Sequence, residues 1–279
     1  MNLRIYNVGH GNASHIVTPA KQLIVVDLGA SSDFSPLGEI ADRTRKINKL
    51  ILTHPHTDHL TEIGDIDGFS VDMLQRPKHL SEQAIRAGNQ AKDKQVLDDY
   101  IAFSKRYSGT VAEDRLIGNP SVSGGVTIKS FYSKDCADSN LNNHSAVTFF
   151  EQDGVVILIP GDNEKPSWRE LLENEDFVSF LARTNVFLVS HHGRESGYCP
   201  ELFSEGGLSP ELCVVSDGPV TDTDVTSRYS QHAKGWDVSS RSKGTSEHRF
   251  CLTTRSDGAI DIAVDRNSNG NPTLKVEIE

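Results

Sequence analysis

The segment Lys49–Leu60, which reads KLILTHPHTDHL, constrains the fold more than any other part of this chain. Its apolar run Leu50–Leu52 is too short for a buried helix and predicts a central strand that is covered on both faces. Polar residues follow directly after this strand, namely His54, His56, Asp58 and His59. Since the carboxyl ends of strands in layered α/β proteins are where ligands bind, we expect a functional site there.

The composition of this polar cluster favours metal binding. A single histidine after a strand is usually a surface residue, but three histidines and an aspartate within six positions would crowd imidazolium groups if no metal kept them neutral. Imidazole and carboxylate together are the ligands expected for Zn²⁺ or a similar transition metal. His54 and His56 point the same way in an extended turn while Asp58 and His59 reach a neighbouring point, so the spacing suits two metals side by side.

Two further apolar runs end in residues that could bind a metal or take part in catalysis. Val155–Ile159 is a β-branched run that ends at Pro160-Gly161-Asp162, and Asn185–Ser190 ends at His191-His192-Gly193. A third run, Leu23–Leu28, contains Asp27 near its end, where a carboxylate is costly unless it is paired. A histidine pair alone is weak support for a site, but its place after another apolar strand strengthens the prediction.

Composition narrows the class of protein. The 279 residues suffice for one layered domain with a large core, and 36% hydrophobic with 24% charged residues are typical of soluble globular proteins. The N-terminal segment lacks the basic and apolar parts of a secretory signal, so we expect a cytoplasmic protein without a membrane partner. The four cysteines are widely separated and predict neither a zinc cluster nor a disulfide framework: Cys136, Cys199, Cys213 and Cys251.

Charge bears on the possible partners. The net charge of −11 does not favour sequence-independent binding to long nucleic acids, although a local basic groove remains compatible with it. The candidates for such a groove are basic residues in a helical segment, where the alternative is a solvated helix face: Arg86, Lys92, Lys94, Lys105 and Arg106.

Periodicity predicts the remaining elements. We expect a hairpin of Leu3–Val8 with Ser14–Thr18, and a second hairpin of Phe250–Thr254 with Gly258–Val264. Helices are expected over Ser35–Lys46, over Lys165–Leu181 and, as one or two helices, within Leu80–Tyr107.

The HxHxDH motif after an apolar strand resembles that of the metallo-β-lactamase-fold hydrolases. The segments VGHGNASHIV, LIVVDLGA and NNHSAVTFFEQDGVVILIPGD, with the later HHG, resemble the ComEC-type hydrolase domain of the competence DNA-uptake channel. The resemblance implies an α/β fold, the αββα sandwich of two mixed β-sheets flanked by helices. It implies a single domain over residues 1–279 with a mainly helical insertion at about 65–120.

The resemblance also implies roles for individual residues. One divalent metal would be held by His54 and His56, and a second by Asp58, His59 and His191, with Asp162 as the bridging carboxylate. His192 would lie outside the ligands or face the substrate, and the reverse order of the two histidines stays open. Asp27 would orient the metal-binding loop. The additional histidine that the superfamily places on the first metal has no aligned counterpart, which leaves three candidates: Asn142, Asn143 and His144.

The implied function is a metal-dependent hydrolase, foremost a phosphodiesterase or nuclease that uses a hydroxide activated by two metal ions, Zn²⁺ or alternatively Mn²⁺. The substrate would be nucleic acid or a nucleotide, with Asp58, His192 and His232 as catalytic residues. Tyr229 and His232 match a Tyr-x-x-His segment of the branch and would bind substrate, although a surface role is equally open. The alternatives are hydrolysis of a non-phosphate ester, lactone or lactam, and a non-catalytic metal-binding sensor or partner subunit.

Overall fold

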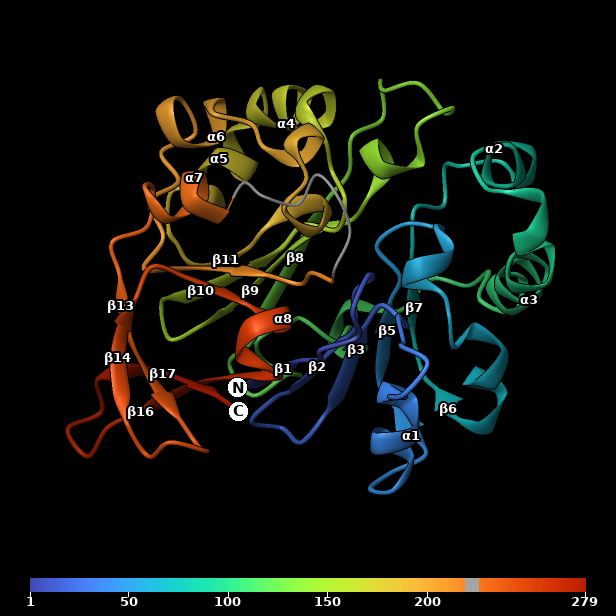
Figure 1. Cartoon of the computed structure of the whole chain (residues 1–279). Helices are drawn as coiled ribbons and strands as arrows, with labels where there is room; N and C mark the ends of the chain where they lie inside the picture. Colours follow the sequence, from blue (N-terminus) through green and yellow to red (C-terminus); the bar gives the residue numbers. More distant parts are fainter. Residues whose placement is uncertain (219–225) are drawn as a thin grey trace.

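Four layers build the molecule: helices, a nine-stranded sheet, a six-stranded sheet and a second set of helices (Figure 1). The computed structural model describes residues 1–218 and 226–279. Both sheets mix parallel and antiparallel pairs, since β2 pairs antiparallel with β3 while β3 pairs parallel with β5, and β10 pairs antiparallel with β9 but parallel with β11. This layering confirms the predicted αββα sandwich.

The nine-stranded sheet joins both ends of the chain, because β1 pairs antiparallel with β16. Its strands, in spatial order, are β14 (Ser246–Arg249), β13 (Trp236–Ser240), β17 (Pro272–Ile278), β16 (Ile260–Arg266), β1 (Asn2–Ile5), β2 (Ser14–Val17), β3 (Leu23–Val26), β5 (Lys49–Ile51) and β7 (Leu74–Gln75). The central strands β3 and β5 are buried throughout, as their continuous apolar runs predict.

The six-stranded sheet faces the first one. Its strands, in spatial order, are β15 (Cys251–Thr253), β12 (Leu212–Val215), β11 (Thr184–Leu188), β10 (Val155–Ile159), β9 (Val147–Gln152) and β8 (Thr127–Phe131). A separate parallel pair consists of β4 (Lys46–Ile47) and β6 (Ser70–Val71).

The helices cover the outer faces of the two sheets (Figure 1). On the nine-stranded sheet lie α1 (Pro36–Ala41), α2 (Glu82–Ala87) and α3 (Lys94–Lys105), and on the six-stranded sheet lie α4 (Lys165–Leu172), α5 (Glu175–Leu181), α6 (Glu201–Ser204) and α7 (Thr226–Ser230). The short helix α8 (Thr254–Asp257) follows β15. No helix in the described ranges is both long and apolar enough to span a bilayer.

Three apolar cores hold these layers together. The central core lies between the sheets and contains residues such as Ile24, Ile51 and Ile157. A second core packs the outer face of the six-stranded sheet against its helices through Phe149, Trp168 and others. A third packs α1 and α3 onto the nine-stranded sheet. Burying this apolar surface is the main favourable term that keeps the strand ends in place.

Three sequence-based expectations about elements were wrong. The helix expected over Ser35–Lys46 ends at Ala41, and Lys46 begins β4. Phe250–Thr254 and Gly258–Val264 do not form a hairpin: β15 pairs with β12 in one sheet, whereas β16 pairs with β1 and β17 in the other, with α8 between them. The helix expected over Lys165–Leu181 is divided into α4 and α5, because the side chain of Asn174 accepts a hydrogen bond from the amide of Phe177 and begins a new helix.

Residues 65–120 contain α2 and α3 but also two short strands, β6 and β7. Because β7 pairs parallel with β5, this segment extends the nine-stranded sheet as well as covering it. The organisation of the chain as a single domain stays a prediction.

Candidate metal centre

Strand ends from both sheets meet at one edge of the sandwich and carry the predicted ligands. These residues are His54, His56, Asp58 and His59 after β5, Asp162 after β10, and His191 and His192 after β11. The short helix η1 (Thr57–His59) follows His56 and turns Asp58 and His59 back toward the sheets. Because β10 and β11 run parallel, their carboxyl ends lie at the same edge.

Gly161 lets the chain turn sharply between β10 and Asp162. Its φ of +64° is in the left-handed region, and a Cβ at this position would lie 2.8 Å from the Cβ of Ser145 and 2.9 Å from that of Thr53. Both the conformation and the lack of space exclude a side chain here. The glycine therefore allows Asp162 to approach the loop that carries the histidines.

Four side chains form a compact group whose ligand atoms all lie within 4.8 Å of one another: Asp58, His59, Asp162 and His192. Nε2 of His59 lies 3.3 Å from Nε2 of His192 and 3.2 Å from Oδ1 of Asp162. Nε2 of His192 lies 3.4 Å from Oδ2 of Asp162 and 3.5 Å from Oδ2 of Asp58. A tetrahedral Zn²⁺ with bonds of about 2.0–2.1 Å separates its ligand atoms by about 3.3 Å, so this donor set fits such an ion.

His54 and His56 form a second donor group beside the first. Nε2 of His54 lies 3.0 Å from Nδ1 of His56 and 3.8 Å from Oδ2 of Asp162. Asp162 lies beside both groups: its Oδ1 is 3.2 Å from Nε2 of His59, and its Oδ2 is 3.4 Å from Nε2 of His192 and 3.8 Å from Nε2 of His54. A carboxylate in this position would be available to a cation in either group.

The structure brings His192 into the compact group and leaves His191 outside it, the reverse of the order preferred from the sequence. Nδ1 of His191 lies 2.9 Å from Oγ of Ser196 and 3.3 Å from Oε1 of Glu164, and its Nε2 lies 3.9 Å from Oδ2 of Asp162, farther than Nε2 of His192 at 3.4 Å. The reason lies in the backbone, because both histidines have left-handed φ values of 51° and 53° instead of continuing the strand. We therefore propose His192 as the ligand and His191 as its supporting neighbour.

Asp27 fixes the loop from beneath. It is fully buried after β3, and its carboxylate accepts hydrogen bonds from the amide of Thr53 at 2.7 Å and the hydroxyl of Thr53 at 2.8 Å. Its Oδ2 also lies 2.8 Å from Nδ1 of His59 and accepts a bond from Nδ2 of Asn12. A carboxylate at Nδ1 leaves Nε2 of His59 free for a metal, which is how outer carboxylates orient histidine ligands.

Replacing Asp27 with asparagine is expected to weaken metal binding by about 10- to 100-fold, because the amide no longer holds His59 in the ligand tautomer. Competition of the purified protein with a chromogenic zinc chelator measures this affinity. Asp33→Asn, which changes an exposed aspartate, is the matched control. An unchanged affinity in Asp27→Asn would show that the carboxylate does not orient the ligand.

Comparison with known proteins identifies the fold. Residues 6–68, which include Asp27 and the whole HxHxDH motif, match the Metallo-beta-lactamase superfamily. Together with the αββα layers, this match is decisive. The chain has the metallo-β-lactamase fold. The match does not distinguish the ComEC-type branch, which stays a prediction, and no curated protein matches the chain.

Several solved structures are similar to this chain. A mutant of the CmlA β-hydroxylase is 14% identical, with a TM-score of 0.49, and this chain spans about half of it (52%) while 90% of this chain is covered. Zn(2+)-bound PqqB from Methylobacterium extorquens is 13% identical, with a TM-score of 0.48 and coverage of 91% of this chain and 98% of PqqB. A putative Zn-dependent hydrolase of the superfamily from Thermotoga maritima is 11% identical, with a TM-score of 0.42 and coverage of 90% and 97%.

The electrostatics of this group of side chains favour cation binding. Burial alone would raise the pKa of Asp162, but the neighbouring His59 and His192 hold it well below its usual range. Burial would lower the pKa of His192, but Asp162 and Asp58 raise it to about 9. Burial and the charge of His59 lower the pKa of His54 well below its usual value, so its imidazole is neutral, as a ligand must be. A divalent cation would displace the protons that the carboxylates hold on His59 and His192.

The three candidates for an additional ligand lie on η5 (Leu141–His144) and point differently. Asn142 lines the pocket over the centre, and its buried Oδ1 has no hydrogen-bond partner among the described residues. Oδ1 of Asn143 accepts a hydrogen bond from the amide of Glu164. Nδ1 of His144 lies 2.9 Å from Nε2 of His79, outside the ligand group. Asn142 is thus the candidate whose side-chain oxygen is available to coordinate a metal at the site.

Tyr229 and His232 lie elsewhere in the metallo-β-lactamase fold. Tyr229 is buried in the core between the six-stranded sheet and its helices, against Phe187 and Tyr198. His232 stacks on Phe203 at 3.7 Å between ring centroids, and its Nε2 lies 2.8 Å from the hydroxyl of Tyr198. Within residues 1–218 and 226–279 neither has a hydrogen bond, ion pair or ring contact to the metal ligands, so the geometry does not support the predicted substrate and catalytic roles.

The pocket over the centre contains residues that the sequence did not single out. It has a volume of about 550 Å³, and its lining includes His10, Asn142, Glu164 and Arg194. The ring of His10 lies 4.8 Å from that of His192, and its Nε2 is 3.4 Å from Oδ2 of Asp58. The only signal in the sequence was proximity, since His10 stands between two glycines and Arg194 directly follows the HHG segment.

Proposed function

We propose that this protein is a metal-dependent phosphodiesterase that acts on nucleic acid or a nucleotide. The observation that carries the proposal is the group of Asp58, His59, Asp162 and His192, whose ligand atoms have the spacing of a metal site and which adjoins His54 and His56. The proposed cofactors are two divalent ions, Zn²⁺ or alternatively Mn²⁺, because imidazole and carboxylate are the donors present. Such ions supply a water nucleophile of lowered pKa and neutralise charge on phosphoryl oxygens.

Arg194 supports an anionic substrate. Its side chain lines the pocket over the centre, and its buried Nε has no hydrogen-bond partner in the part of the chain that the structure describes. A guanidinium presents its donors in a fork that matches two oxygens of a phosphate. The neighbouring Glu164 does not occupy the guanidinium of Arg194, because its carboxylate is bound to η6 (Ser190–Gly193) through His191. The hydrogen bond from His191 lowers the pKa of Glu164 to about 2.

His10 and Asp58 also line the pocket over the centre. Burial and the nearby His192 lower the pKa of His10, so its imidazole is neutral near pH 7 and can donate or accept a hydrogen bond to a substrate oxygen. The volume of about 550 Å³ is that of a pocket for a small molecule or for one end of a longer chain. A phosphodiester placed between Arg194 and the carboxylate-rich ligand group would meet a donor on one side and the bound cations on the other.

A substrate panel tests this function. Protein loaded with Zn²⁺ or Mn²⁺ is expected to hydrolyse bis-p-nitrophenyl phosphate and oligonucleotides or cyclic nucleotides, but not lactones, lactams or carboxylic esters at comparable rates. Turnover of a lactone, lactam or carboxylic ester alone would reject the phosphodiesterase proposal. Full metal occupancy without turnover on any member would favour a metal-binding sensor.

Arg194→Gln is expected to raise KM for a phosphodiester by about tenfold while it changes kcat less, because a charged hydrogen bond to the phosphate is lost in substrate and transition state alike. Steady-state kinetics on bis-p-nitrophenyl phosphate measure both constants. Arg169→Gln, which removes an exposed arginine paired with Glu201, is the matched control. Equal KM values in Arg194→Gln and wild type would remove Arg194 from the substrate site.

A further inference from the structure

A separate pocket of about 680 Å³ lies at the open side of the sandwich. It lies where the last strands of the two sheets, β7 and β8, come together, and Nε2 of Gln75 on β7 donates a 2.6 Å hydrogen bond to Oγ of Ser130 on β8. The loop that contains Gly109–Val111 closes one part of it. It shares no lining residue with the pocket over the metal centre, so the function of the metal centre does not account for it.

Positive charge gathers in this pocket although the chain is acidic overall. Its lining contains Lys49, Arg76, Lys78 and Lys134, and it contains no aspartate or glutamate. In the described ranges, none of these four side chains lies within 4.0 Å of a carboxylate oxygen. With a net charge of −11 and 39 acidic residues available, the absence of a carboxylate from this lining is a specific feature.

Among these four cations, Lys49 gives the strongest indication of an anionic ligand. Only 6% of the residue is exposed, and its Nζ donates one hydrogen bond, to the carbonyl of Ile117 at 3.2 Å. Burial lowers its pKa to about 8, so the ammonium is desolvated without a neutralising partner. Arg76 adds a buried Nε without a hydrogen-bond partner in the described residues. Buried donors of this kind are costly unless a ligand satisfies them.

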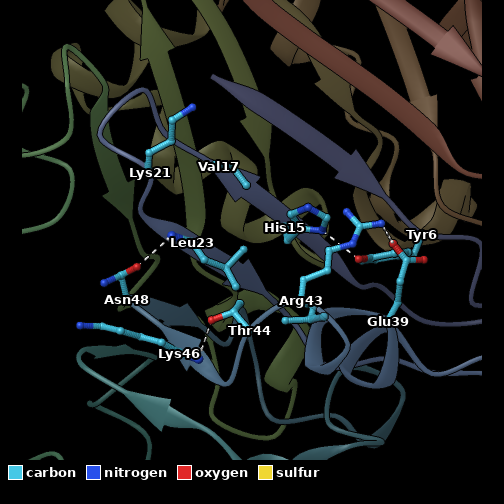
Figure 2. Close-up of a pocket in the computed structure, with 11 residues that line it drawn as sticks. Tyr6, His15, Val17, Lys21, Leu23, Glu39, Arg43, Thr44, Lys46 and Asn48 are labelled. Atoms are coloured by element: carbon cyan, nitrogen blue, oxygen red, sulfur yellow. Dashed lines mark hydrogen bonds and ion pairs between the residues drawn. The ribbon is translucent and has the colours of Figure 1, made fainter.

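Several cations elsewhere in this protein are paired with acids. In the smaller pocket of about 290 Å³ shown in Figure 2, Arg43 reaches Glu39 at 3.2 Å. Lys46, in the same pocket, lies 3.2 Å from Asp72. Four of the five basic residues of the helical segment are also paired, which favours a solvated face for them: Arg86 with Glu82 and Asp98, Lys94 with Asp98, Lys105 with Glu82, and Arg106 with Asp67. The pocket between β7 and β8 differs from these surfaces in leaving its cations without acids.

Much of the remaining lining is apolar and indicates the chemistry of the rest of the ligand. Met73, Ile128 and Tyr132 line the pocket beside the cations. Val111 and Leu116, which belong to the same lining, are 42% and 38% exposed. An inorganic anion alone would leave this apolar surface in water, whereas a ligand with a flat apolar part would cover it.

We propose that this pocket binds a small polyanion with an aromatic body, of the nucleotide class, at a site separate from the metal centre. Phosphate oxygens would accept hydrogen bonds from Lys49, Arg76 and Lys134, and the base would lie against Tyr132 and Leu116. The volume of about 680 Å³ is within the range of small-molecule sites. The proposal does not depend on the phosphodiesterase function, since it requires binding only.

Isothermal titration of the metal-loaded protein with ADP, inorganic phosphate and adenosine tests the site. ADP is expected to bind more tightly than either of the other two, because only ADP meets both the cations and the apolar lining. Lys49→Met and Arg76→Gln are each expected to weaken ADP binding by about tenfold or more, since each removes a charged hydrogen bond. If Lys49→Met fails to fold by circular dichroism, Arg76→Gln combined with Lys134→Gln takes its place.

Two further variants decide where ADP binds. The double variant Arg43→Gln/Lys46→Gln removes two positive charges from the pocket in Figure 2, as many as Arg76→Gln combined with Lys134→Gln removes from the proposed site. It should leave the affinity for ADP unchanged. Asp162→Asn alters the metal centre and should also leave it unchanged. ADP binding that is lost in Asp162→Asn, that persists in Lys49→Met and Arg76→Gln, or that is absent in wild type would overturn the proposal. Tighter binding of a short oligonucleotide than of ADP, lost with Arg76→Gln, would also overturn it in favour of a nucleic-acid surface.

Discussion

Replacing Asp162 with asparagine should lower the bound metal from about two equivalents to less than one and reduce hydrolysis by more than about 100-fold. The reason is its position, with Oδ1 3.2 Å from Nε2 of His59 and Oδ2 3.8 Å from Nε2 of His54. Loss of a residue that only orients a ligand costs about 10- to 100-fold, so loss of a shared ligand should cost more. Elemental analysis of freshly purified protein, together with steady-state kinetics, measures both effects.

The fold should survive this change, because Asp162 lies on a strand end and not in an apolar core. Circular dichroism is therefore expected to match that of wild type. Asp237→Asn, at an exposed position on β13, makes the same chemical change away from the centre and should retain both metals and activity. Asp162→Asn protein that still holds two equivalents of metal would contradict a bridging role.

The second large effect distinguishes two adjacent histidines. His192→Asn is expected to lose metal and to reduce hydrolysis by more than about 100-fold, whereas His191→Asn, which removes only a supporting neighbour, should reduce it by about tenfold. Nε2 of His192 lies 3.3 to 3.5 Å from the other three ligand atoms, while Nδ1 of His191 contacts Ser196 and Glu164. Asparagine is the appropriate replacement, because both positions have a positive φ that asparagine tolerates better than alanine.

Each histidine variant serves as the control for the other, since the two share backbone conformation and neighbouring segments. Metal content and kcat on bis-p-nitrophenyl phosphate are the measurements. The opposite outcome, with His191→Asn the more damaging, would restore the order preferred from the sequence. Equal, small effects would mean that neither histidine binds metal.

The sequence placed the candidate ligand segment correctly at the end of a buried strand, because the relevant interactions are local. His54, His56, Asp58 and His59 lie within six positions after one buried strand, and that strand is recognisable from its apolar run alone. The partner of this segment was also predictable, since Asp27 ends another apolar run where a buried carboxylate needs hydrogen bonds. The structure supplies those bonds from Thr53 and His59.

Several other features depended on contacts between distant segments. The roles of His191 and His192 follow from two consecutive left-handed residues, which no local pattern indicated. Tyr229 and His232 were expected to bind substrate, but Tyr229 packs in the apolar core and His232 stacks on Phe203. The two strands Phe250–Thr254 and Gly258–Val264 looked like a hairpin, but each had a better-matched neighbour in a different sheet.

By itself, the sequence determined the layered fold and the group of candidate metal ligands at one edge, because apolar runs specify strands and a dense group of donors favours a metal site. Only the tertiary structure decided which histidine completes that group, and it alone gathered Lys49, Arg76, Lys78 and Lys134 around one pocket. These cations come from β5, from the segment after β7 and from the segment after β8. Their proximity results from sheet pairing and the packing of two sheets, which depend on contacts across the whole chain and not on the residues beside each cation.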